Sequence, residues 1–119
     1  MTRQQHNEAP KRVALYARSS QGNPPGGIEA LQAQVNRCTA YCLEHGYIVP
    51  HYQRYTEVQV GSSDSPRPAL ARLGEAVRQG CVDVVVVSSL DRLSRDPAQS
   101  TILLEEFKAS GVTIATAGA

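Results

Sequence analysis

The sequence predicts a three-layer α/β domain in which a mainly parallel sheet of about four strands lies between helices. Three observations lead to this fold class. Short stretches rich in Val and Leu alternate along the chain with stretches of helical periodicity. The stretch "CVDVVVVSS" is β-branched through its middle, as in a strand buried on both faces. Glycines stand where each helical stretch ends, at Gly46, Gly80 and Gly111.

The first ordered element is a strand at about residues 11–18, which follows a polar leader over 1–10 that we expect to be disordered. Side chains alternate along an extended chain. Two sets therefore lie on opposite faces: Val13, Leu15 and Ala17 on one, and Tyr16, Arg18 and Ser20 on the other. A hydroxyl and a guanidinium thus share one face of this strand.

A helix and a second strand are expected next. The helix begins near Ile28, because apolar residues follow at helical spacing: Leu31, Val35, Cys38 and Cys42. Alternating apolar residues over 47–55 predict a strand, and Pro50 places that strand at an edge of the sheet. The polar stretch "EVQVGSSDSPRP" then predicts a loop.

The second half of the chain repeats the helix and strand pattern. A helix over about 68–79 presents Leu70, Leu73 and Val77 to the core, and a central strand follows within 81–89. Asp96, Pro97 and Gln99 open a helix that runs to about Ser110, and "VTIATA" is the fourth strand. Strands that alternate with helices imply right-handed βαβ units.

Composition narrows the class of protein. The chain has 119 residues, fits one domain and carries a net charge of +1, so charge alone does not indicate a nucleic-acid partner. The sequence has neither an apolar run near the ~20 residues of a membrane span nor a signal peptide. We therefore expect a cytoplasmic protein that does not associate with a membrane. Three cysteines without a CxxC pair favour neither disulfides nor a metal site.

Polar residues gather where two predicted strands end. Ligands of parallel sheets bind beyond the carboxyl ends of the strands, so residues 18–20 and 88–95 meet there. In "SLDRLSR", one turn of helix places Asp91 and Arg95 on one side, with Leu90 and Leu93 as anchors on the other. The simplest interpretation is a surface salt bridge. Together with Arg18, Arg92 and Ser20, however, the cluster surrounds a hydroxyl with cations, as a phosphate site requires.

Four motifs now resemble those of the serine recombinases, also called resolvases and invertases. They are "YARSS", "LQAQVNRCTAYCLEHGY", "SPRPALARL" and "VDVVVVSSLDRLSR", which occur in the family's order within residues 11–117. The resemblance implies a resolvase-like catalytic domain over 11–119 that cleaves and rejoins double-stranded DNA through a 5′-phosphoserine intermediate. It also implies a homo-oligomer, dimer to tetramer in the full-length protein, and no cofactor.

The resemblance assigns roles to individual residues. Ser20 would be the nucleophile, and the scissile phosphate would be contacted by Arg18, Arg67, Arg92 and Arg95. Asp91 would orient the arginines or relay a proton, and Gln34 of the first helix would help to hold the site. Tyr16 matches the family's strand tyrosine, and Glu57 falls where an acidic residue is usual.

The proposed nucleophile has a neighbour that must be weighed against it. Ser19 is adjacent, but strand alternation favours Ser20 because only Ser20 shares the face of Arg18. No His lies in a motif, so a serine–histidine pair is unsupported, and positive charge would instead ease formation of the alkoxide. The loop after Ser20 is longer than is usual in the family, and Pro24 replaces its customary glutamine.

Two other classes stay open at this point. A non-catalytic assembly module would keep the fold without the reaction, although Ser20 and the four arginines argue against it. A receiver or flavodoxin-like phosphate-binding domain would be favoured if Asp91 bound a metal, but a receiver needs acids where Arg18 stands. No helix-turn-helix or basic tail is present, so we expect sequence-directed DNA binding to reside elsewhere and this fragment alone to be inactive.

Overall fold

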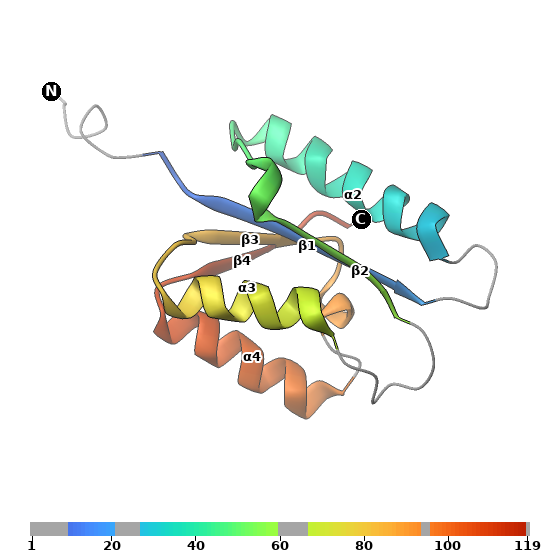
Figure 1. Cartoon of the computed structure of the whole chain (residues 1–119). Helices are drawn as coiled ribbons and strands as arrows, with labels where there is room; N and C mark the ends of the chain where they lie inside the picture. The colour runs from blue at the N-terminus through green and yellow to red at the C-terminus, as the bar shows by residue number, and fades with distance from the viewer. Residues whose placement is uncertain (1–9, 21–26, 60–66, 94–95, 119) are drawn as a thin grey trace, which may run out of the picture.

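The computed structural model describes residues 10–20, 27–59, 67–93 and 96–118 and confirms the three-layer α/β fold. Four parallel strands form one sheet in the order β2-β1-β3-β4. The strands are β1 (Val13–Ser20), β2 (Arg54–Gln59), β3 (Val84–Val87) and β4 (Thr113–Thr116). Helix α2 (Gly27–Glu44) covers one face of the sheet, and α3 (Pro68–Arg78) and α4 (Pro97–Ala109) cover the other (Figure 1).

The alternation predicted for β1 sets the two cores. Ala14 and Tyr16 belong to the core beneath α3 and α4, where Leu73 and Phe107 join them. The opposite core lies beneath α2 and includes Val13, Leu15, Ala17, Cys38 and Val86. β1 is buried along nearly its whole length, because it pairs with β2 on one side and β3 on the other. β1 is therefore an inner strand of the sheet, and Ser20 lies at its carboxyl end.

The second strand is displaced from its prediction. The sequence pattern placed a strand over 47–55, but 47–50 are irregular, 51–53 form a 3₁₀ turn, and the strand occupies Arg54–Gln59. The apolar pattern has another cause, since Tyr47 and Val49 pack against the core beneath α2 without pairing in the sheet. The edge position of β2 is confirmed. Its polar second half, assigned to a loop by the sequence, is part of the strand.

The remaining elements match their predictions within a few residues. Helix α3 buries Leu73 and Val77, whereas Leu70 is partly buried. Helix α4 begins at Pro97 beneath the cap residue Asp96, whose carboxylate accepts a hydrogen bond from the amide of Ala98. None of the described helices is long and apolar enough to span a bilayer. The predicted leader lies, apart from residue 10, outside the described residues.

The chain after β4 passes against the end of β3. The amide of Ala117 donates to the carbonyl of Val87 at 2.7 Å. A Cβ added to Gly118 would lie 2.0 Å from the carbonyl oxygen of Ser88, so only glycine fits there without a shift of the backbone. This close approach supports the loop that leads from β3 into the candidate site.

The three cysteines give a direct test of this packing. Cys38 and Cys42 lie on the buried side of α2, whereas Cys81 is exposed. Burial raises the pKa of the Cys38 thiol to about 11, and burial likewise raises the pKa of Cys42. The thiolate is the reactive form, so a disulfide reagent at pH 8 should modify Cys81 quickly and the other two only after denaturation. Equally fast modification of all three would contradict the packing of α2.

Candidate active site at the carboxyl end of the sheet

β1 ends with two serines whose side chains lie in different surroundings. Ser19 is 1% exposed, and its hydroxyl donates to the carbonyl of Gly27 at 2.6 Å. Ser20 is the last residue of the strand and is partly exposed. By alternation Ser20 shares a face with Tyr16 and Arg18. Of the two hydroxyls, that of Ser20 is therefore better placed for a ligand beyond the sheet.

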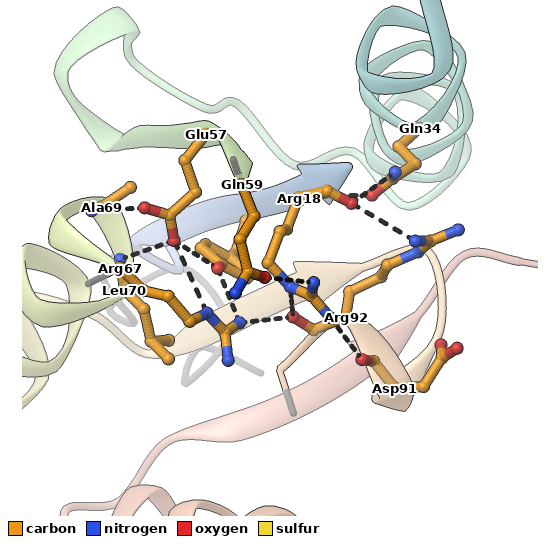
Figure 2. A network of polar contacts seen from close by, with 10 residues as sticks. Arg18, Gln34, Glu57, Gln59, Arg67, Ala69, Leu70, Asp91 and Arg92 are labelled. Atoms are coloured by element: carbon orange, nitrogen blue, oxygen red, sulfur yellow. Dashed lines mark hydrogen bonds and ion pairs between the residues drawn. The ribbon is translucent and has the colours of Figure 1, made fainter. Parts of the chain in front are cut away.

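Arg18 joins the end of β1 to two neighbouring segments. Its Nε donates to the carbonyl of Arg92 and its Nη2 to the carbonyl of Asp91, both at 3.1 Å (Figure 2). Its Nη1 donates to Oε1 of Gln59, at the end of β2, at 2.8 Å. The residue is only 3% exposed. Only the planar fork of an arginine can donate at once to the acceptors of both segments, the turn at residues 91–92 and the end of β2.

Gln34 holds the backbone of Arg18 from the α2 side. Its Oε1 accepts from the Arg18 amide at 3.1 Å, and its Nε2 donates to the Arg18 carbonyl at 2.6 Å. The register of β1 with β3 runs only to the pair Leu15 and Val86. Beyond that point the buried amide of Gln34 satisfies the strand's polar groups as a neighbouring strand would.

Arg67 enters the site from the start of α3. Its Nη2 donates to the Tyr16 hydroxyl at 2.8 Å and to the carbonyl of Arg92 at 2.7 Å. The guanidinium also lies 5.7 Å from the centre of the Tyr16 ring. Arg67 and Arg18 thus both donate to the Arg92 carbonyl, which brings the predicted cations from β1 and α3 together.

Arg92 and Asp91 lie in a 3₁₀ turn, η2 (Leu90–Arg92), that follows β3. The Nη1 of Arg92 lies 3.4 Å from the Arg18 carbonyl, and its buried Nε has no hydrogen-bond partner among the described residues. The Asp91 carboxylate accepts from the Ser89 hydroxyl and points away from Arg18 and Arg67 (Figure 2). The backbone carbonyl of Asp91, not its carboxylate, contacts Arg18.

The predicted helical turn around "SLDRLSR" is only partly correct. Leu93 is fully buried, as an anchor should be, but Leu90 is 42% exposed. The turn is a single 3₁₀ turn over Leu90–Arg92 and not a turn of α-helix, and only Leu93, the residue that follows it, reaches the core. Arg95, the fourth arginine predicted for the site, lies outside the described residues.

Two further residues meet the site through β2. The parallel register sets Glu57 opposite Arg18 and Gln59 opposite Ser20. The sequence did not indicate a role for Gln59, because the stretch that begins at Glu57 was predicted to be a loop. The alternation of Tyr55, Glu57 and Gln59 was the available signal, since a strand would bring these three side chains to one face.

The electrostatics of the cluster favour an anion. Arg18 donates to two backbone carbonyls and an amide oxygen. Glu57 pairs with Arg67 at 3.9 Å. Burial and the hydrogen bond to Glu57 raise the pKa of Tyr16 well above its ordinary value, although Arg67 opposes this shift. Tyr16 is therefore a neutral donor at physiological pH, and the guanidinium groups supply the positive charge.

Comparison with known proteins identifies the family of this chain. Residues 13–118 match the family described as "Resolvase, N terminal domain". This chain belongs to the serine recombinase family. The match covers every described element, and no finding favours a receiver or flavodoxin-like domain.

Solved structures of an integrase domain and of two recombinases show the same fold. The N-terminal catalytic domain of TP901-1 integrase is 31% identical with a TM-score of 0.70, covering 88% of this chain and 76% of that one. The C-terminal catalytic domain of ISC1926 TnpA, an IS607-like serine recombinase, is 29% identical with a TM-score of 0.73, covering 91% and 71%. A resolvase family site-specific recombinase from Streptococcus pneumoniae is 25% identical with a TM-score of 0.75, covering 90% and 72%.

Proposed function

We propose that this serine recombinase domain cleaves and rejoins double-stranded DNA with Ser20 as the nucleophile. The observation that carries the proposal is the convergence of Arg18, Arg67 and Arg92 at the carboxyl end of the sheet, beside the strand that ends in Ser20. Three guanidinium groups from separate segments are thus held together by hydrogen bonds at this end of the sheet. Such a fixed cluster of cations stabilises the charge that develops on a phosphate during substitution.

The reaction proceeds in two balanced steps. The Ser20 oxygen attacks phosphorus as its proton leaves, and the bond to the 3′ oxygen breaks. The products are a 5′-phosphoserine ester and a DNA strand whose 3′ oxygen has taken up a proton. In the second step a 3′-hydroxyl of the exchanged strand loses its proton and attacks the same phosphorus. The bond to the Ser20 oxygen breaks, that oxygen takes up a proton, and the phosphodiester is re-formed. Each step exchanges one phosphate ester for another, so rejoining requires no nucleotide hydrolysis.

The arginines and the polar residues have different roles in the proposed reaction. Arg18, Arg67, Arg92 and Arg95 contact the scissile phosphate, and Gln34 holds the backbone that carries Arg18. Asp91 orients the arginines, or relays a proton after a rotation of its side chain. In the observed conformation its carbonyl contributes by fixing Arg18.

Assembly completes the proposed function. Strand exchange joins ends from two DNA duplexes, so the working enzyme is a homo-oligomer, dimer to tetramer, and residues 11–119 act as its catalytic domain. Sequence-directed binding resides outside these residues, because phosphate contacts alone carry no base information. A protein that acts on DNA must work in the compartment that contains the DNA, and the predicted cytoplasmic location agrees with this requirement.

A nicked DNA substrate tests this function directly. The full-length protein is incubated with duplex DNA that carries a nick near the crossover point, so that cleavage releases a short strand and rejoining fails. We expect a protein–DNA adduct that survives denaturation. The adduct should contain the labelled DNA strand whose 5′ end lies at the break. Strand exchange without a covalent adduct would refute the proposal, and complete inactivity on a verified recombination site would favour the non-catalytic assembly module.

A further inference from the structure

The carboxylate of Glu57 connects three elements at once. The Tyr16 hydroxyl donates to Oε2 at 2.5 Å from β1. The amides of Ala69 and Leu70 donate to Oε1 at 3.0 Å and to Oε2 at 3.3 Å from the first turn of α3. Arg67 brings its Nε to 3.9 Å from Oε2 (Figure 2). One side chain on β2 thus holds a tyrosine, a helix and an arginine.

This arrangement supplies a helix cap from a different strand. The first four amides of an α-helix lack intrahelical acceptors, and a side chain at the cap position normally accepts from one of them. In α3 the cap residue is Arg67, whose side chain makes no capping hydrogen bond. The Glu57 carboxylate instead accepts hydrogen bonds from two of these amides. Its negative charge also interacts favourably with the positive end of the helix dipole.

Burial makes the contact specific. The side chains of Glu57 and Arg67 are 10% and 17% exposed, so water competes little for their polar atoms. Glu57 fixes Arg67 in two ways. It anchors the turn that carries the Arg67 backbone, and it orients the Tyr16 hydroxyl that accepts from Arg67.

We propose that Glu57 is a positioning residue for recombination: it locks the first turn of α3 to β1 and thereby sets the guanidinium of Arg67 against the scissile phosphate. Glu57 itself does not contact DNA. The inference rests on the proposed function, in which Arg67 binds that phosphate. It gives a role to a second residue of β2, beside Gln59, which contacts Arg18.

Amide hydrogen exchange tests the geometry without DNA. Amides in the first turn of a helix ordinarily exchange fast, so the bonds to Glu57 should protect those of Ala69 and Leu70. In Glu57→Gln we expect this protection to fall by about tenfold, while amides in the middle of α3 keep theirs. Glu57→Asp retains the charge and should restore part of the protection. Glu75→Gln is the matched control, because Glu75 pairs with Arg78 on the exposed face of the same helix.

Single-turnover adduct formation tests the role in the reaction. With the full-length protein and nicked DNA, Glu57→Gln should lower the rate by about 10-fold or more. In an Arg67→Lys background the same change should lower the rate by less than about threefold, because its effect passes through Arg67. Thermal melting of each variant verifies that it is folded, and Glu75→Gln should react like wild type.

Each outcome decides a different point. Equal rate losses in both backgrounds would overturn the positioning role, since a purely structural defect acts regardless of residue 67. Unprotected Ala69 and Leu70 amides in the wild type would overturn the geometry. A wild type that forms no adduct, with the amides protected, would refute the proposed function and with it the role of Glu57 in recombination, while leaving the cap in place.

Discussion

Ser20→Ala should abolish the covalent adduct with nicked DNA, lowering its rate of formation by at least about 10³-fold. The substitution removes the oxygen that attacks phosphorus and nothing that the core requires, because Ser20 is the partly exposed last residue of β1. The free energy of unfolding should therefore change by no more than about 0.5 kcal/mol. Gel electrophoresis of denatured reactions, together with thermal melting, measures both quantities.

Ser19→Ala is the matched control for that experiment. Ser19 is buried and its hydroxyl donates to the Gly27 carbonyl, so removing it should cost about 1 kcal/mol of stability. Adduct formation should remain within about threefold of wild type, since no reacting atom is lost. An adduct that persists in Ser20→Ala and disappears in a folded Ser19→Ala would reverse the assignment.

Arg18→Lys should lower the rate of adduct formation by about 100-fold or more, although the positive charge is kept. One ammonium group cannot reproduce the donors by which Arg18 reaches the carbonyls of Asp91 and Arg92 and the amide of Gln59. The η2 turn then loses its link to β1. We also expect a loss of about 1–3 kcal/mol in the free energy of unfolding, because buried acceptors are left without donors.

The comparison between Arg18→Lys and Arg18→Ala separates charge from geometry. If fixed geometry dominates, the two variants should react at similar low rates under single-turnover conditions. If Arg18 served only as a distant charge, the lysine variant would retain most of the activity. The second result would contradict the arrangement described here, in which neutral acceptors hold the guanidinium plane in one orientation.

The sequence predicted the layout of the site because the fold class rests on strong local patterns. The β-branched run that ends in Val87 forms the central strand, and alternation along β1 places Ser19 and Ser20 in different environments. Arg67 was predicted only through family resemblance. No periodicity links the start of α3 to the carbonyl of Arg92, a contact that depends on how the helix packs on the sheet.

The errors of prediction have physical causes as well. The apolar residues before Arg54 pack on the core without joining the sheet, so alternation over 47–55 predicted a strand several residues early. That shift concealed Gln59, which acts on Arg18 only because β2 extends alongside β1 to its end. The Asp91 carboxylate could not be placed either, since a 3₁₀ turn directs it toward Ser89.

The measurement that tests the central claim most directly is the identification of the residue joined to DNA. The trapped adduct is digested with nuclease and trypsin, and tandem mass spectrometry is applied to the peptide 19–37, which begins immediately after Arg18 and contains both serines. We predict that the nucleotide remnant, attached through its 5′ phosphate, lies on the second residue of this peptide, Ser20. A remnant on Ser19, on a residue outside the peptide, or attached through a 3′ phosphate would contradict the account.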